Sequence, residues 1–245
     1  MKPSFCVVVP HYDHVEPLGR TLSKLASHLL PIIVVDDGSP PKVRSQVISM
    51  CEDREGVSAI SLRENSGKGG AVKAGLREAL RREFTHAIQI DADGQHDLSV
   101  LPTMMEETSE YPDSLIAAHP MYDESVPMSR LLGRKLTNFM VVVETLSKKL
   151  PDVMCGFRIY PLDSIVPLLG IQKMGERMDF DIEIMVRAYW EGVNIRFLPV
   201  HVRYPEHGVS HFRLLRDNAL ISFKHAQLVF GMFPRIPSLI RGRPP

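Results

Sequence analysis

Short apolar runs alternate with helical patterns along the first half of the chain. Residues 4–9 and 32–35 are continuous apolar runs, which is typical of strands buried on both faces of a parallel sheet. Residues 57–62, 87–90 and 114–118 continue the series with weaker patterns. Apolar residues recur at helical spacing over three intervening segments, 15–29, 72–80 and 101–105. This alternation predicts βαβ units, and therefore an α/β protein with a mostly parallel central sheet flanked by helices.

A long amphipathic pattern opens the second half. Apolar positions alternate by four and three from residue 132 to residue 150 and predict one long helix. Residues 192–202 are predicted as one or two strands. Because no Gly- or Ser-rich linker interrupts the chain, we predict one domain over residues 1–212.

The C-terminal segment, residues 213–245, is predicted as a basic helical extension. It has six basic residues and one acid, Asp217. On a helical wheel, Arg213, Arg216 and Lys224 fall within an arc of about 80°. Such a helix could lie on an anionic membrane surface, or it could pack on the domain with its charges in solvent.

The overall composition is that of a globular protein. The 245 residues include 29 Lys plus Arg against 29 Asp plus Glu, and 44% are hydrophobic, which excludes wholesale disorder and a strongly basic nucleic-acid-binding body. The three cysteines form no CxxC pair, so that neither a disulfide framework nor a thiolate zinc site is predicted. No apolar run approaches the roughly 20 residues of a spanning helix. We therefore expect a cytoplasmic protein that does not cross a membrane.

Polar clusters follow three of the predicted strands, at residues 10–13, 36–39 and 91–95. Ligands of open α/β sheets bind beyond the carboxyl ends of the strands. Carboxylates gathered there repel one another unless a cation or a donor-rich ligand lies between them. Any one cluster is as consistent with a turn or a helix cap, but the three together indicate a binding site.

Asp91 and Asp93 are the strongest of these signals. Two carboxylates two residues apart at a strand end can reach one divalent cation, and Gln95 adds a neutral oxygen. Oxygen ligands favour Mg²⁺ or Mn²⁺, which typically bridge to substrate phosphates. The segment is not an EF-hand loop, since His96 and Pro102 stand where glycine and glutamate are required.

A glycine-rich run, residues 65–71, precedes a predicted helix, and its amides together with Lys68 could hold an anion. It is not a Walker A loop, because Gly69 stands where Ser or Thr must follow the lysine. It is not a dinucleotide fingerprint either, which would follow the first strand.

Six ordered motifs resemble the family 2 glycosyltransferases of the GT-A (nucleotide-diphospho-sugar transferase) fold, and most of all the dolichyl- and polyprenyl-phosphate sugar synthases. The resemblance spans residues 4–212. The motifs are Val8-Val9-Pro10, Val34-Val35-Asp36-Asp37-Gly38-Ser39, Asn65-x-Gly67-Lys68-Gly69-x-Ala71, Asp91-Ala92-Asp93-Gly94-Gln95-His96, Asp152-x-x-Cys155-Gly156-Phe157-Arg158 and Phe180-Asp181-Ile182-Glu183-Ile184. The chain departs from the family after Pro10, where His11-Tyr12-Asp13-His14 replaces the usual Pro-x-Tyr-Asn-Glu continuation.

The resemblance implies roles for individual residues. Nucleotide-binding roles fall on Pro10, Tyr12, Asp36, Asp37, Lys68, Asp91 and Ala92, with Asp37 at the uracil or ribose. Metal-binding roles, for Mg²⁺ or Mn²⁺, fall on Asp91, Asp93 and Gln95, and catalytic roles on Asp93 and Asp181. Acceptor- and sugar-side roles fall on Cys155, Gly156, Phe157, Arg158, Asp179, Ser210 and His211.

The implied reaction is an inverting, metal-dependent transfer from a UDP- or GDP-linked sugar. The expected acceptor is a lipid or polyprenyl phosphate at the cytoplasmic membrane face, with peripheral membrane contact and no nucleic acid. A lipid phosphate is already ionised near neutral pH, whereas a hydroxyl acceptor needs a base, for which Asp181 is the candidate. The alternatives are a hydroxyl acceptor on a glycan or secondary metabolite, and a non-catalytic nucleotide-sugar-binding protein. A nucleotidyltransferase is disfavoured, since no Gly-rich loop follows the first strand.

Three further residues have structural interpretations beside the functional ones. On a helix, Glu183 would share a face with Asp179 but not with Asp181, and a salt bridge from Glu183 to Arg187 is as consistent with the spacing as a functional role. Cys155 is favoured as a packing residue over a nucleophile. His211 stands where many members of the family have a lysine, in a segment expected to form a flap over the acceptor. A zinc site that includes His211 is disfavoured, because the spacing of the nearby histidines lacks a His-Glu-x-x-His pattern.

Overall fold

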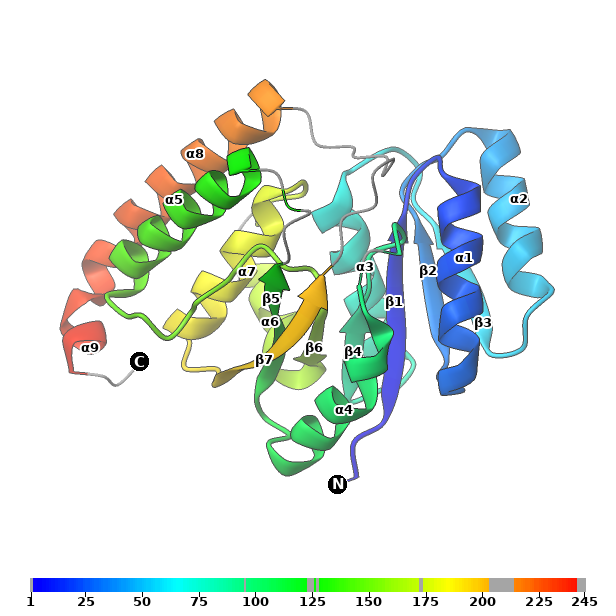
Figure 1. The fold of residues 1–245 in the computed structure, drawn as a ribbon, viewed down its shortest axis with the longest axis horizontal. Coiled ribbons are helices and arrows are strands. Elements are labelled where there is room, and N and C mark those ends of the chain that lie inside the picture. Colours follow the sequence, from blue (N-terminus) through cyan, green and yellow to red (C-terminus); the bar gives the residue numbers. More distant parts are fainter. Residues whose placement is uncertain are drawn as a thin grey trace.

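A computed structural model describes residues 2–94, 96–122, 126, 128–171, 174–202 and 214–241. Seven strands within these residues form one sheet: β1 (Phe5–His11), β2 (Ile32–Asp36), β3 (Val57–Ser61), β4 (His86–Gln89), β5 (Leu115–Tyr122), β6 (Arg158–Pro161) and β7 (Ile195–Val202). Their order across the sheet is β3-β2-β1-β4-β6-β5-β7. The helices are α1 (Val15–Leu25), α2 (Pro41–Glu52), α3 (Lys68–Arg81), α4 (Leu101–Glu110), α5 (Met128–Thr145), α6 (Leu162–Ile171), α7 (Asp179–Trp190), α8 (Leu214–Met232) and α9 (Ile236–Ile240) (Figure 1).

The sheet is mostly parallel, as the sequence predicts. Strands β3, β2, β1 and β4 pair in parallel, with Val7 opposite Ile32 and Phe5 opposite His86. Strand β7 pairs in parallel with β5, while β6 is antiparallel to both β4 and β5. Strand β6 was not predicted, because its four residues include an arginine and a proline and form no apolar run.

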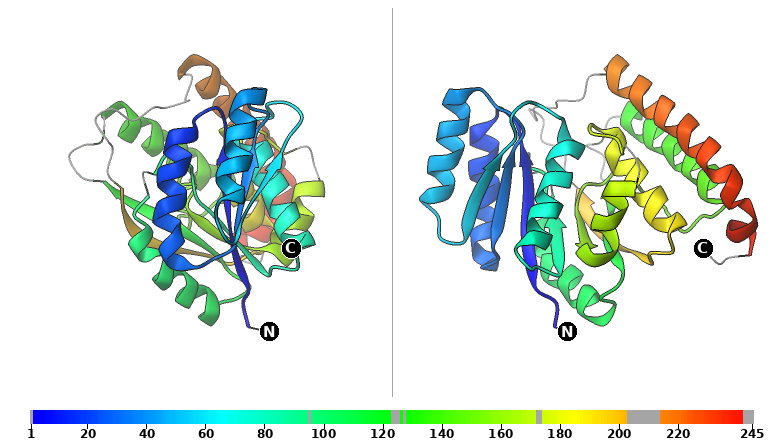
Figure 2. Two further views of the ribbon diagram at one scale, coloured as in Figure 1. Left: turned by 90° about the vertical axis from the view of Figure 1, so that its right-hand side faces the viewer. Right: turned by 180° about the vertical axis from the view of Figure 1, so that it is seen from behind.

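Helices cover both faces of the sheet, and each face has its own core (Figure 2). Along β1, Val7 and Val9 point to the core with α1, α2 and α4, whereas Cys6 and Val8 point to the core with α3, α6 and α7. Successive side chains of a strand point to opposite faces, so that a strand buried on both faces is apolar at every position. This explains the continuous apolar runs of β1 and β2.

Helix α5 ends earlier than the amphipathic pattern predicts. It stops at Thr145, and Leu146 adopts a left-handed backbone conformation, with φ of 50°. Leu150 is buried after this turn instead of continuing the helix. The helical spacing of Leu146 and Leu150 therefore does not reflect a helix, because the chain turns after Thr145.

The C-terminal helix α8 packs against α5 and α7, and α5 and α8 lie side by side (Figure 1). Ile221, Leu228 and Met232 of α8 are buried in the same core as α3 and α7. Lys224, predicted on a basic surface, is buried and faces α7. Arg216 is exposed, so the two described basic residues do not share one solvent-facing surface, and Arg213 lies outside the described residues. A helical wheel alone does not tell which side of α8 faces the protein. None of the described helices combines the length and the hydropathy required to span a membrane.

Candidate active site

Lys68 joins two of the predicted motifs at the carboxyl edge of the sheet. Its Nζ lies 2.9 Å from Asp91 Oδ2, just after β4, and 2.9 Å from Asp181 Oδ2, in the first turn of α7. Burial alone would lower the pKa of Lys68, but the carboxylates of Asp181 and Asp91 raise it well above its ordinary value. The lysine is therefore a fixed positive charge between the two acids.

Asp91 is held as a carboxylate. Burial alone would raise its pKa, but Lys68 and His96, whose Nε2 lies 3.7 Å from Asp91 Oδ2, hold it well below the usual range. Its other oxygen, Oδ1, is buried and accepts no hydrogen bond from the described residues. A buried carboxylate oxygen without a donor is costly, and a cation would satisfy it.

Helix α1 holds the turn that carries Asp91 and Asp93. Thr21 Oγ1 donates a hydrogen bond of 3.0 Å to the Ala92 carbonyl, and Lys24 Nζ donates one of 3.2 Å to the Gly94 carbonyl. Gly94 has φ of 70°, which a residue with a side chain rarely adopts. Neither contact can be predicted from the sequence, since Thr21 and Lys24 lie within an ordinary helical pattern.

The donor set for a divalent cation is incomplete within the described residues. No three His, Cys, Asp or Glu side chains between residues 2 and 241, the undescribed positions excepted, are grouped so that they could hold a metal ion. Gln95, the third predicted ligand, lies outside the described residues. Of the predicted ligands, Asp91 offers a carboxylate oxygen without a donor, and a cation held there would take its remaining oxygens from elsewhere, such as a substrate diphosphate.

Gly156 lies directly against this centre. A Cβ at this position would lie 2.7 Å from Lys68 Nζ, 2.8 Å from Asp91 Oδ2 and 2.9 Å from Gln89 Nε2. These separations are shorter than real Cβ contacts, so that any side chain here would displace the lysine or the carboxylate. The predicted Cys155–Arg158 motif thus reaches the site through its glycine backbone.

A buried polar network lies behind Asp181. Arg158 Nη1 is 3.6 Å from Asp181 Oδ1, and Gln89 Nε2 donates a hydrogen bond of 3.5 Å to the same oxygen. Tyr160 OH donates to Gln89 Oε1 at 2.8 Å and accepts from Arg158 Nη1 at 3.2 Å. Burial raises the pKa of Tyr160 to about 12, so that it remains a phenol donor. Sequence reasoning missed Gln89 and Tyr160, although a glutamine within a buried strand was a signal.

Asp37 clamps the glycine-rich loop. Its Oδ1 and Oδ2 accept hydrogen bonds of 2.8 Å from the Ser66 and Gly67 amides, respectively. Gly38, with φ of 68°, lets the two loops approach so closely that a Cβ would lie 2.4 Å from the Glu64 backbone. The contact between Asp37 and a base or ribose stays a prediction, while the contacts present here position the loop of Lys68.

Asp36, the residue before Asp37, is the more deeply buried of the two. It is fully buried, 3.5 Å from His11 Nδ1 and 3.4 Å from Arg44 Nε. Burial lowers the pKa of His11, although Asp36 opposes this effect. Pro10 is buried at the end of β1, and Tyr12 follows it with an exposed side chain. Pro10 pairs with Val35 of β2, and the nucleotide-binding roles of Pro10 and Tyr12 stay predictions.

The other predicted acceptor-side residues divide into three groups. Cys155 and Phe157 are buried, and burial raises the pKa of the Cys155 thiol to about 12, which fits its interpretation as a packing residue. Arg158 is internal and touches Asp181 from behind. Ser210 and His211 lie outside the described residues.

Asp179 does not join the Lys68 centre, and its acceptor-side role stays a prediction. Its Oδ2 lies 3.6 Å from Lys224 Nζ, on the face of α7 that also carries Glu183. Lys224 Nζ is 2.6 Å from Glu183 Oε2, and Arg187 Nη2 is 2.7 Å from Glu183 Oε1. The i, i+4 salt bridge to Arg187 is therefore present, and the helical spacing separates Asp181 from the other two acids as predicted.

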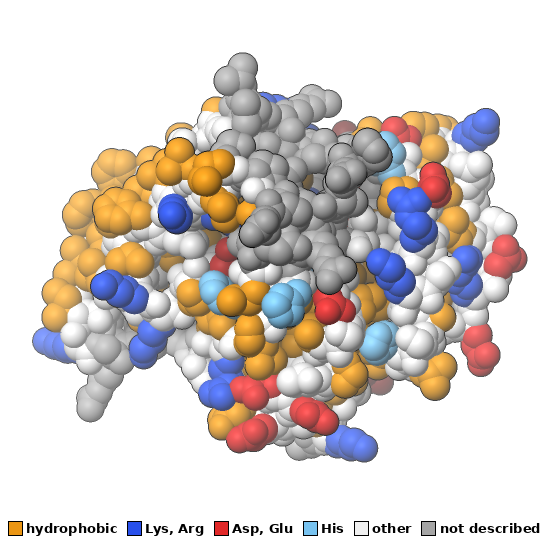
Figure 3. Space-filling model, in the orientation of Figure 1, with side chains coloured by type: hydrophobic (Ala, Val, Ile, Leu, Met, Phe, Trp, Pro, Cys, Tyr) orange, Lys and Arg blue, Asp and Glu red, His pale blue; other side chains and the backbone are white. Residues whose placement is uncertain are grey.

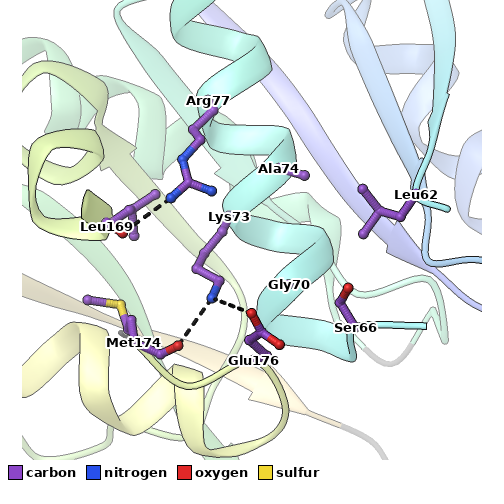
Figure 4. A pocket seen from close by; sticks show the side chains of 9 residues that line it. All are labelled: Leu62, Ser66, Gly70, Lys73, Ala74, Arg77, Leu169, Met174 and Glu176. Carbon is purple, nitrogen blue, oxygen red and sulfur yellow. Dashed lines mark hydrogen bonds and ion pairs between the residues drawn. The ribbon is translucent and has the colours of Figure 1, made fainter. Parts of the chain in front are cut away.

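A cavity of about 360 Å³ lies on another side of α3 (Figure 4). Lys73 Nζ donates to the Met174 carbonyl at 3.2 Å and lies 3.6 Å from Glu176, and Arg77 donates to the Leu169 carbonyl. Lys68, Asp91 and Asp181 are not among its lining residues. Lys73 and Arg77 both donate hydrogen bonds to carbonyl groups of residues 169–174. The cavity therefore lies where α3 packs against α6 and the segment that follows α6.

Residues 6–165 match the family described as Glycosyl transferase family 2. Over 209 residues, the chain is 25% identical to an undecaprenyl-phosphate mannosyltransferase of Micrococcus luteus, with 79% of this chain and 81% of that protein covered. Over 239 residues, it is 24% identical to a UDP-N-acetylglucosamine–dolichyl-phosphate N-acetylglucosaminyltransferase of Methanococcus voltae, with 89% and 91% covered.

The solved structures include a similar fold. The glucosyl-3-phosphoglycerate synthase of Mycobacterium tuberculosis, in complex with Mn²⁺, UDP and phosphoglyceric acid, superposes with a TM-score of 0.67. The superposition covers 94% of this chain and 78% of that chain, at 15% sequence identity. At this identity the likeness concerns the fold alone, which is the predicted GT-A fold.

Proposed function

Because the chain belongs to glycosyl transferase family 2, we propose that it transfers a sugar from a UDP- or GDP-linked donor to a polyprenyl-type lipid phosphate. The observation that carries the proposal is the centre in which Lys68 bridges Asp91 and Asp181, with Gly156 against it. The lipid-phosphate acceptor is supported by the relatives from Micrococcus luteus and Methanococcus voltae, whose names specify such acceptors.

On the donor side, Asp91, Asp93 and Gln95 would hold Mg²⁺ or Mn²⁺. The unsatisfied Oδ1 of Asp91 supports this assignment. When bound, a divalent cation offsets the negative charge that develops on the leaving nucleoside diphosphate. Lys68 adds a fixed positive charge beside Asp91, and Asp37 holds the loop that carries the lysine.

On the acceptor side, a lipid phosphate supplies its own ionised nucleophile. Its oxygen would attack the anomeric carbon from the face opposite the leaving diphosphate, which inverts the configuration. Asp181 would then act by positioning, because it holds Lys68 and is itself held by Arg158 and Gln89. A hydroxyl acceptor would instead require Asp181 to take up its proton.

The test compares two acceptors of equal chain length, a polyprenyl phosphate and the corresponding polyprenol. Purified protein is incubated with each acceptor, a panel of UDP- and GDP-sugars, and Mn²⁺ or Mg²⁺. We expect a lipid-linked sugar phosphate of inverted anomeric configuration, and no product from the alcohol. Transfer to the alcohol would overturn the proposed acceptor.

Donor binding is tested separately by thermal shift. Nucleoside diphosphate with Mn²⁺ should raise the melting temperature, because a ligand that binds only the folded state stabilises it. Asp93→Ala should lose the metal-dependent part of the rise and retain the fold. Absence of any metal-dependent shift with any nucleotide would contradict the donor and cation assignments together.

A further inference from the structure

Large apolar side chains are exposed together on α5, α8 and the short helices after α8. Of the exposed large apolar residues described, eight lie here: Met128, Leu132, Leu136 and Phe139, then Phe223, Phe230, Phe233 and Ile240. Phe139 is 63% exposed and Phe230 is 73% exposed. The space-filling view shows hydrophobic side chains gathered over α5 and α8 (Figure 3). Proteins rarely leave so large an apolar surface without a partner.

The charges on this surface are of one sign. Lys135, Arg216 and Arg241 are exposed there, with Lys148 and Lys149 in the turn after α5. The acids of the described parts of α5 and α8 are Glu144 and Asp217, and both are buried. We call the eight apolar residues and these five basic residues the α5–α8 face. It presents apolar and cationic side chains to solvent, and no acidic side chain.

We propose that the α5–α8 face docks on an anionic lipid bilayer. The aromatic and leucine side chains would enter the boundary between headgroups and acyl chains, while the basic residues meet lipid phosphates. A second copy of the chain is the other apolar occupant, but it would bring the same basic residues against one another. An anionic membrane supplies the opposite charge, so charge complementarity favours lipid.

The face is connected to the candidate active site. Helix α7 carries Asp181 toward Lys68 on one side and Glu183 toward Lys224 of α8 on the other. A second buried contact joins α8 to α5, where His225 Nδ1 lies 2.7 Å from Glu144 Oε1. Docking through α5 and α8 would therefore hold the site at a fixed height above the membrane. The inference deepens the proposed function, because a polyprenyl phosphate acceptor lies in that membrane.

Flotation of the full chain with vesicles tests the proposal. Phosphatidylcholine vesicles, with and without phosphatidylglycerol, are compared at low and high salt. We expect binding to the anionic vesicles that weakens as salt rises. Each of Phe139→Ser and Phe230→Ser should lower the partition coefficient about tenfold. Leu29→Ser is the matched control, since Leu29 is 90% exposed but lies outside the face, and it should bind as the unmodified protein does.

Three outcomes would overturn the proposal. They are absence of binding to anionic vesicles, equal loss of binding in Leu29→Ser, and a dimer in lipid-free buffer that the Phe139→Ser and Phe230→Ser variants abolish. Circular dichroism verifies that the exposed substitutions leave the fold intact. Transfer to a short, water-soluble polyprenyl phosphate separates the two proposals, since it requires the site and no membrane. Transfer without vesicle binding rejects only the docking face, and vesicle binding without transfer rejects only the acceptor.

Discussion

Two clusters on helix α7 each join carboxylates to a lysine, which is half-buried in one cluster and buried in the other, and they differ in what they leave unsatisfied. On one face, Asp181 meets Lys68, which also meets Asp91. On the other, Glu183 and Asp179 meet Lys224. Both clusters place carboxylates around a lysine, so residue type alone does not distinguish a reactive site from a structural one.

The Lys224 cluster is closed. Glu183 receives hydrogen bonds from the Gly175 amide and from Arg187 as well as its contact with Lys224. Burial alone would raise the pKa of Glu183, but these donors hold it below its ordinary value. Both carboxylate oxygens of Glu183 therefore have donors within the protein, and neither requires a ligand.

The Lys68 cluster is open. Asp91 Oδ1 accepts no hydrogen bond from the described residues, and the neighbouring Gly156 keeps side-chain atoms out of the space around Lys68 and Asp91. An unsatisfied carboxylate oxygen beside a glycine leaves room for a cation, which would supply the missing positive charge. The difference indicates that Lys68 serves function and Lys224 serves stability.

The largest expected effect is on activity, and it separates the two clusters directly. Asp91→Asn should reduce transfer about 10²–10³-fold, because it removes the charge on which nucleotide and cation binding depend. Glu183→Gln is the matched change in the closed cluster and should leave the activity of the folded protein within a few-fold. Steady-state rates of transfer by both variants, corrected for the folded fraction, test this prediction. Equal losses in the two variants would mean that the clusters are not functionally distinct.

The second prediction concerns the space beside Lys68. Gly156→Ala places a methyl group where the Lys68 amine and the Asp91 carboxylate lie, so it should cost on the order of a hundredfold in activity through misplacement of these groups. Gly170→Ala is the control, since a Cβ there meets no atom within 4 Å. Near-normal activity of Gly156→Ala would show that the centre tolerates displacement.

The third prediction concerns stability. Lys224→Met should destabilise the fold by about 3 kcal/mol, because it leaves buried acids short of a cation. Lys135→Met, an exposed lysine of α5, is the control and should change stability by less than about 0.5 kcal/mol. Urea unfolding measures both. Retained stability in Lys224→Met would contradict the structural role assigned to the closed cluster.

The sequence predicted the open cluster better than the closed one, for a physical reason. Two residues of the open cluster, Lys68 and Asp91, come from the segments that follow β3 and β4, and parallel strands bring their carboxyl ends to one edge of the sheet. Asp91 and Lys68 could therefore be placed near one another. Lys224 comes from a helix whose orientation depends on tertiary packing. Its partners on α7 could not be inferred from the helical wheel, although the i, i+4 spacing of Asp179 and Glu183 was informative.

Other parts of the site depend on contacts between distant segments. Thr21 and Lys24 of α1 donate hydrogen bonds to carbonyl groups of the Asp91–Gly94 turn. The periodicity of the sequence identifies these two residues only as positions of a helix. Gln89 and Tyr160 meet because β6 lies antiparallel to β4, a pairing that four residues with no apolar run do not predict. Local patterns identified the motifs, and the order of the strands determined which of them meet.

The smallest expected effect is a pH dependence within the closed cluster. Since the pKa of Glu183 is below its ordinary value in the folded state, its contribution to stability is full above the unfolded pKa of about 4.3. That contribution is lost as the pH falls through the folded-state pKa. Lys224→Met removes one cause of the lowered pKa, so the difference in unfolding free energy between this variant and the unmodified protein should shrink between pH 7 and pH 3. Urea titrations at both pH values measure it. A difference that stays constant or grows would show that the loss of stability in Lys224→Met does not come from the charge of Lys224 beside Glu183.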